Sequence, residues 1–121
     1  MVIPISLPDE EVLRAILRVK CSRIVEQDLP EEFVRLVALL IADLHREKSV
    51  YVGPSIRSGI YALSTAVAMA DLEGEEPAAN HLEEAVVDNF SSIVEGDFGG
   101  DHEKREFIRA SFRKAKRELQ T

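Results

Sequence analysis

The spacing of apolar residues between Pro30 and Glu47 limits the fold of this chain more than any other feature of its sequence. Five of these residues recur at positions i, i+3, i+4, i+7 and i+11: Phe33, Leu36, Val37, Leu40 and Leu44. That spacing places them on one face of an α-helix. Val34, Leu39 and Ile41 widen the apolar face, so we expect this helix to form the buried centre of the fold.

Four further segments show helical spacing. One follows a helix start at Ser6-Leu7-Pro8-Asp9, and another runs from about Pro54 to Glu73 and ends at Gly74. Their expected inward residues are Val12, Leu13, Ile16 and Leu17; Ile60, Leu63, Val67 and Ala70; Leu82, Ala85, Val86 and Phe90; and Ile108, Phe112, Ala115 and Leu119. Cys21–Leu29 and Gly96–Asp101 are interpreted as connections. We therefore expect an all-α bundle of about five helices, in which residues 95–121 form a C-terminal helical extension packed on residues 1–94.

Charge and composition exclude several classes of function. The net charge of −7 argues against generic binding to nucleic acid or to anionic membranes, since both require a basic surface. No apolar run approaches the roughly 20 residues of a membrane helix, and the first residues do not form a secretory signal. Cys21 is the only cysteine, which fits a reducing compartment. We expect a cytoplasmic protein.

The last 21 residues differ from the rest in charge. Residues 101–121 contain seven Lys or Arg against four acidic residues. One interpretation is a solvated helix face with favourable positive charge at its C-terminal end. The other is a docking helix for an acidic partner surface, including another copy of the same protein. The sequence leaves both open.

Other combinations of polar residues are expected to be structural. Asp97-Phe98-Gly99 repeats the magnesium-binding tripeptide of kinases, but the chain has no kinase lysine and no catalytic loop. The acids at 97, 101 and 103 alternate as in a calcium loop, yet His102 and Ile108 stand where that loop needs Gly and Glu. We expect no metal site from the scattered histidines and the single cysteine: His45, His81, His102 and Cys21.

The run Gly53-Pro54-Ser55-Ile56-Arg57 opens the third expected helix and holds the strongest candidate for function. The free N–H groups and the positive dipole end of a helix start favour phosphate. Arg57 adds a fixed charge with a planar donor fork that suits phosphate oxygens. The chain has no loop that could cradle the rest of a nucleotide. These residues therefore predict half of a phosphate site.

With its surroundings, this run resembles the helical lid of an AAA+ ATPase of the MoxR branch. The resemblance covers roughly Leu7 to Val87, and its most distinctive part is the Gly-x-Ser-x-Arg turn at residues 53–57 followed by an Ala-rich helix. The chain departs from the family pattern at Ile56, where proline is common. It also departs at Glu75–Asn80, which is a poor copy of the usual Tyr-Val-Thr-Pro stretch.

The resemblance implies that Arg57 is the sensor 2 arginine, which contacts the ATP γ-phosphate and couples hydrolysis to lid movement. It implies that Gly53, Pro54 and Ser55 contribute to the nucleotide site and that residues 1–94 are a lid-like domain. The implied partners are the parent protein's own nucleotide-binding core with ATP and Mg²⁺, neighbouring subunits of a ring, and a client protein with a von Willebrand A domain. No G-x-x-x-x-G-K-[ST] motif occurs in the chain, so the isolated chain is expected not to hydrolyse ATP.

A function of another class also fits the sequence. The chain could be a free-standing helical interaction module or a small dimeric regulator without nucleotide chemistry. In that case Arg57 is an ordinary surface residue, and the basic final helix is the contact face.

Overall fold

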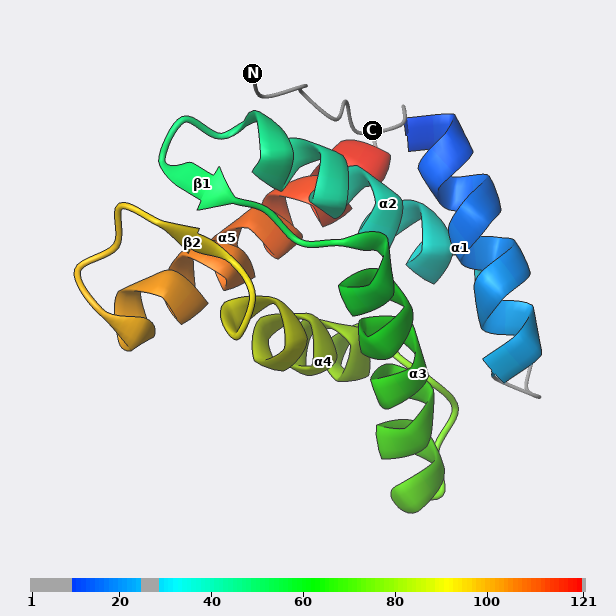
Figure 1. Cartoon of the computed structure of the whole chain (residues 1–121). Helices are drawn as coiled ribbons and strands as arrows, with labels where there is room; N and C mark the ends of the chain where they lie inside the picture. Colours follow the sequence, from blue (N-terminus) through cyan, green and yellow to red (C-terminus); the bar gives the residue numbers. More distant parts are fainter. Residues whose placement is uncertain (1–9, 25–28, 121) are drawn as a thin grey trace.

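The computed structural model describes residues 10–24 and 29–120, with side chains described from residue 10 to 20 and from 29 onward. Within these ranges the chain forms five α-helices and one small sheet, arranged as a bundle (Figure 1). In chain order the elements are α1 (Glu10–Ile24), α2 (Glu31–Arg46), β1 (Val50–Val52), α3 (Ile56–Leu72), α4 (Ala79–Ser91), β2 (Glu95–Gly96) and α5 (Asp101–Leu119). The expected all-α bundle is confirmed. The start expected at Ser6–Asp9 lies outside the described residues.

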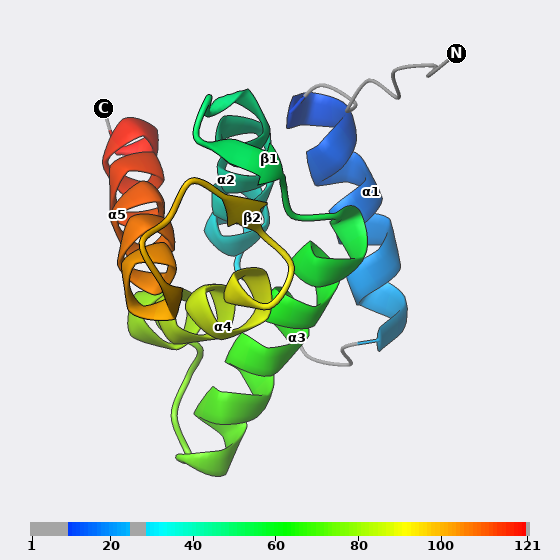
Figure 2. The same ribbon diagram turned by 60° about the vertical axis from the view of Figure 1, so that its left-hand side comes forward.

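Helix α2 is the centre of the fold, as its sequence predicts. It packs against α1, α3 and α5, which surround it in the two views of Figures 1 and 2. Its buried residues include the whole expected apolar face: Phe33, Val34, Leu36, Val37, Ala38, Leu39, Leu40, Ile41, Ala42 and Leu44. Helix α5 packs on α2 and α4, so its inner residues join the same core as those of the other helices.

Most of the other expected inward residues are also buried. They are Leu13, Leu17, Ile60, Leu63, Val67, Ala70, Leu82, Ala85, Val86, Phe90, Ile108, Phe112 and Ala115. Ile16 and Leu119 are only partly buried, and Val12 is an exception, because 45% of it is exposed. The expected boundary of the first helix was also wrong, since α1 continues to Ile24 through part of the predicted connection. Val12 lies outside the narrow buried face of α1, in which Leu13 and Leu17 are the only completely buried residues among the side chains described.

The two-stranded sheet is a feature that the helical spacing did not predict. β1 and β2 pair antiparallel, with Val50 opposite Gly96 and Val52 opposite Glu95. The N–H of Asp97 donates to the carbonyl oxygen of Ser49 at 2.8 Å. This close approach requires glycine at position 96, since a Cβ there would lie 2.1 Å from that same oxygen. The sheet thus ties the segment before α3 to the segment before α5.

Helix α3 ends where the sequence predicts, in a rigid turn. Gly74 has a φ of 68°, the left-handed conformation that glycine adopts most easily. The N–H of Gly74 donates to the oxygen of Asp71 at 3.1 Å, and the N–H of Glu75 donates to that of Ala70 at 2.9 Å. These two bonds form a Schellman motif. The turn projects from the rest of the molecule in both ribbon views (Figures 1 and 2).

Candidate functional site

The turn that precedes α3 is held in place by His45, which lies at the end of α2. The Nε2 atom of His45 and the carbonyl oxygen of Pro54 are 2.8 Å apart. Gly53 lies directly beneath the imidazole, because a Cβ at this position would approach the ring to 2.8 Å. Gly53 and Pro54 therefore fix the path of the backbone between β1 and α3.

The first turn of α3 is closed by its own serines. Ser55 is the N-cap residue, and its Oγ accepts the N–H of Ser58 at 3.1 Å. The Oγ of Ser58 donates in return to the carbonyl oxygen of Ser55 at 2.7 Å. One residue later, a Cβ on Gly59 would meet Ile41, Val37 and Leu17 side chains within 3.3 Å. The start of α3 is thus anchored on both α1 and α2.

Arg57 lies on the solvent side of this anchored turn. Its side chain is exposed, while Ser58, Gly59 and Ile60 beside it are buried. The side chain of Arg57 has no hydrogen-bond or ion-pair partner among the described residues. An exposed guanidinium on a rigid helix start can contact an oxyanion that arrives from outside, and the backbone that carries it needs no further ordering.

The structure gives different roles to the other residues of the predicted site. Gly53 and Pro54 shape the turn, and the Oγ of Ser55 is already occupied by the helix cap. Among the described side chains of residues 53–57, only that of Arg57 presents an unoccupied donor group to solvent. Whether it contacts a nucleotide remains a prediction. Cys21 belongs to the residues whose side chains are not described.

The acids near residue 100 have local structural roles. The Tyr51 hydroxyl donates to a carboxylate oxygen of Asp97, across the β1–β2 sheet. This bond raises the pKa of Tyr51 above its ordinary value of 10.0, because the hydroxyl donates to a carboxylate. A carboxylate oxygen of Glu103 accepts the N–H of Gly99 at 2.9 Å, at the start of α5.

Sequence reasoning missed the role of His81, which is completely buried at the start of α4. Its Nδ1 accepts the N–H of the N-cap residue Ala78 at 3.0 Å, and its Nε2 lies 2.7 Å from a carboxylate oxygen of Glu73. Glu75 lies near the same nitrogen, at 3.6 Å. The position of His81 in the sequence could have indicated this role, because it stands three residues after the N-cap residue, where Glu or Gln often closes a helix start.

These three side chains are close enough to hold a metal ion, but the hydrogen bonds favour a structural role. Because Nδ1 accepts an N–H, the proton of the neutral imidazole lies on Nε2. Nε2 then donates to Glu73 and has no lone pair for a cation. The cluster closes α4 and fastens the end of α3 to it.

Three arginines of α5 are paired with the acids of α4. Arg105 bonds Asp88 at 2.7 Å, and Arg109 bonds Glu83 and Glu84 at 2.8 Å each. Arg113 donates to Glu83 through its Nε, also at 2.8 Å. This half of the basic helix therefore serves the internal packing of α5 on α4. Lys116 and Arg117, nearer the end of α5, form no ion pair within the part of the chain that the structure describes.

Two further findings concern the described helices and the comparisons with known proteins. None of the helices in residues 10–24 and 29–120 is long and apolar enough to span a membrane. Comparison of the chain with protein-family models, curated proteins and solved structures gave no match.

Proposed function

We propose that this chain is the lid domain of a cytoplasmic AAA+ ATPase of the MoxR type, with Arg57 as its sensor 2 arginine. The observation that carries the proposal is the exposed, unpaired guanidinium of Arg57 on a helix start fixed by His45 and Gly59. The sequence resemblance over residues 7–87 supports the same assignment.

The arrangement suits an arginine that senses phosphate from a separate body. Arg57 would contribute one charged contact to the γ-phosphate of ATP. The parent's own core would bind the remainder of the nucleotide and Mg²⁺, because Gly53, Pro54 and Ser55 are occupied by the turn and the cap. A change of charge at the phosphate then alters the attraction between the core and this lid, which shifts the lid between open and closed positions.

The proposed partners follow from the same assignment. They are the parent's nucleotide-binding core, neighbouring subunits of a ring, and a client protein with a von Willebrand A domain. The isolated chain is proposed to have no ATPase activity. The client role follows by analogy with the family.

Two measurements test the proposal. The native gene product should have an intact mass well over twice the 13.5 kDa of this chain, and a product of about this mass would overturn the proposal. In the longer product, Arg57→Ala should lower ATP turnover by about tenfold or more, and Arg57→Lys should restore only part of it. Arg46→Ala, which also removes an exposed arginine at a helix end, is the control and should leave turnover unchanged.

A helical interaction module is the second candidate, and one observation favours it. Several large apolar side chains are exposed on the described surface, among them Tyr51, Tyr61 and Leu72. Such side chains are common at protein interfaces. A native product of this size with full function after Arg57→Ala would establish this alternative.

A further inference from the structure

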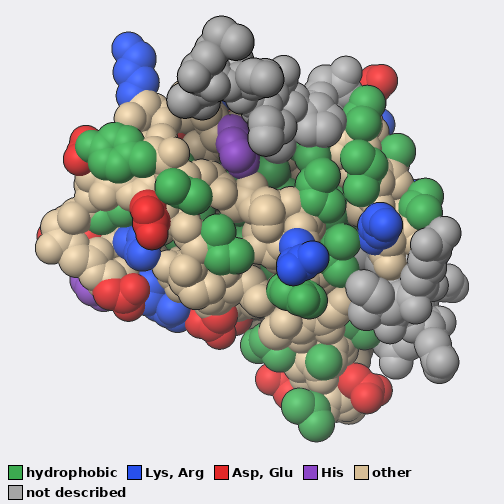
Figure 3. Space-filling view, viewed as in Figure 1, with side chains coloured by type: hydrophobic (Ala, Val, Ile, Leu, Met, Phe, Trp, Pro, Cys, Tyr) green, Lys and Arg blue, Asp and Glu red, His purple; other side chains and the backbone are tan. Residues whose placement is uncertain are grey.

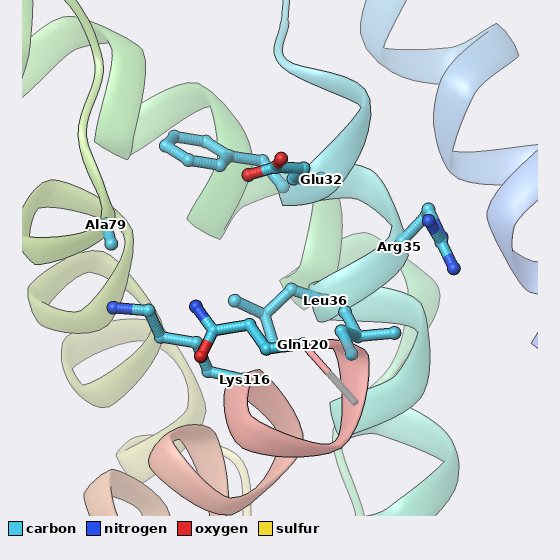
Figure 4. Close-up of a pocket in the computed structure, with 8 residues that line it drawn as sticks. Glu32, Arg35, Leu36, Ala79, Lys116 and Gln120 are labelled. Atoms are coloured by element: carbon cyan, nitrogen blue, oxygen red, sulfur yellow. The ribbon is translucent and has the colours of Figure 1, made fainter.

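The end of α5 and the start of α4 enclose two adjoining hollows that share Ala79, Lys116 and Gln120. The first, of 170 Å³, is lined by the apolar residues Phe33, Leu36 and Leu119 and, on its α2 side, by the charged residues Glu32 and Arg35. We name it the apolar hollow. Figure 4 shows the side chains of Lys116 and Gln120 directed into the space between α5 and Ala79. The second, of 390 Å³, lies along α4 and α5, and we name it the cationic hollow.

The cationic hollow has an uncompensated positive charge. It is lined by Arg113, Lys116 and Arg117, and its one acidic residue, Glu83, is bonded by Arg113 and Arg109. Lys116 and Arg117 have no acidic partner among the described residues. This is unexpected in a chain whose net charge is −7, because acids are abundant elsewhere on the surface. Glu32 lies on the α2 side of the apolar hollow, so an acidic ligand is favoured on the α4 side.

The projecting turn between α3 and α4 has the complementary chemistry. We name residues 71–76 the tip; it contains Leu72 and four acids, Asp71, Glu73, Glu75 and Glu76. Leu72 is 89% exposed, which is the highest value among the large hydrophobic residues of the described chain. Figure 3 shows hydrophobic and acidic side chains together at this projecting end.

The tip is also rigid. The Schellman bonds to Asp71 and Ala70 fix its backbone, and the buried His81 holds Glu73 from inside. A preorganised segment loses little conformational entropy when it binds. The tip therefore matches the two hollows in chemistry: Leu72 suits the apolar hollow, and the neighbouring acids suit the cationic hollow.

We propose that two copies of this chain associate through these surfaces, with the tip of one copy in the hollows of the other. Leu72 enters the apolar hollow, and the acids of the tip face Lys116 and Arg117. Because the tip and the hollows both adjoin the start of α4, a two-fold axis lets each copy donate its tip to the other. The association does not depend on the proposed ATPase role.

The first test is the oligomeric state of the chain in sedimentation velocity from about 10 to 500 μM protein, the range in which weak dimers form. A concentration-dependent dimer is expected at 50 mM salt, and it should weaken at 500 mM salt because exposed charges are screened. A monomer at all concentrations overturns the proposal.

Charge reversal gives a sharper test, because the two surfaces can be reversed separately. The hollow variant Lys116→Glu with Arg117→Glu, and the tip variant that changes Asp71, Glu75 and Glu76 to Lys, should each raise the dimer Kd by roughly tenfold or more. An equimolar mixture of the two variants should restore association, because each reversed tip then meets a reversed hollow. Failure of the mixture to associate overturns the proposal.

Two further variants separate this contact from general charge effects. Lys48→Glu with Lys114→Glu makes the same charge change in a different hollow, which Asp43 and Arg46 also line. It should leave the Kd within about twofold, and an equal loss here would refute the assigned surface. Leu72→Ser should weaken the dimer without any charge change, and an unchanged Kd would exclude Leu72 as the anchor. Circular dichroism confirms that each variant is folded.

Discussion

The contact between α4 and α5 makes a quantitative prediction about Glu83. This carboxylate accepts from Arg109 at 2.8 Å and from Arg113 at 2.8 and 3.4 Å. Its side chain is only 16% exposed. Glu83→Gln keeps the shape and one acceptor oxygen but removes the negative charge between two arginines. We expect the free energy of unfolding to fall.

The expected loss follows from the two contacts. A hydrogen bond to a charged group contributes about 1.5–3 kcal/mol when partly buried, which applies to Arg109. The ion pair with Arg113 contributes less than the contact with Arg109, because the side chain of Arg113 is 60% exposed and solvent screens its charge. Since Gln retains a weaker hydrogen bond, the net loss is about 1–2 kcal/mol at pH 7.

The adjacent residue supplies a matched control. Glu84 also accepts from Arg109 at 2.8 Å, but its side chain is 46% exposed and has this one partner among the described residues. Glu84→Gln should therefore cost no more than about 0.5 kcal/mol. Urea unfolding followed by circular dichroism measures both variants. Equal losses for the two substitutions would refute the argument that burial strengthens the Glu83 contacts.

The pH dependence of the same variants gives an independent check. Hydrogen bonds from Arg113 lower the pKa of Glu83 from its ordinary value of 4.5; partial burial opposes this, and Arg109 adds to it. A lowered pKa gives stability that is fully present above pH 4.5 and is lost as the pH falls through the folded-state pKa. The difference between wild type and Glu83→Gln should thus narrow only below about pH 4.5. Burial raises the pKa of Asp43. Because Asp43 is present in both proteins, its contribution to the pH dependence cancels in the difference.

Three other substitutions test the remaining structural assignments. Gly96→Ala should destabilise the fold by about 1–3 kcal/mol in urea unfolding, since its Cβ would displace the Ser49 carbonyl; an unchanged midpoint would show that the sheet contributes nothing. His81→Ala should cost about 2–3 kcal/mol in a thermal melt, through lost burial and an open Ala78 N–H, and a loss below 0.5 kcal/mol would contradict the capping role. Arg57→Ala should change stability by less than about 0.5 kcal/mol, and a loss of several kcal/mol would mean that this arginine is structural.

The helices were predictable because helical spacing is a local property of the sequence. All eight residues predicted for the apolar face of α2 are buried, and Gly74 marked the end of α3. The sheet was not predictable, because Val50–Val52 is only three residues long and its partner lies more than 40 positions away. Val12 failed for a related reason, since only the packing of α1 decides how wide its buried face is.

For the candidate site, the sequence predicted the place of Arg57 in a helix but not the contacts that hold that helix start. The sequence placed Arg57 in the first turn of a helix, but the anchoring of that turn by His45 depends on contacts across nine residues. The split of α5 into paired and unpaired cations was also invisible in the sequence. All five of these residues are basic: Arg105, Arg109, Arg113, Lys116 and Arg117. The first three differ from the last two only because acids of α4 lie within reach of their side chains.

The small sheet has a consequence for the order in which the molecule folds and opens. Its strands close a loop of about 45 residues that contains α3 and α4, and closing a loop of that length costs about 3 kcal/mol of chain entropy. The helices form from local contacts, which are fast, so the strands should pair last. The N–H of Asp97, bonded to Ser49, should then exchange its hydrogen with solvent well before the N–H groups in the middle of α2.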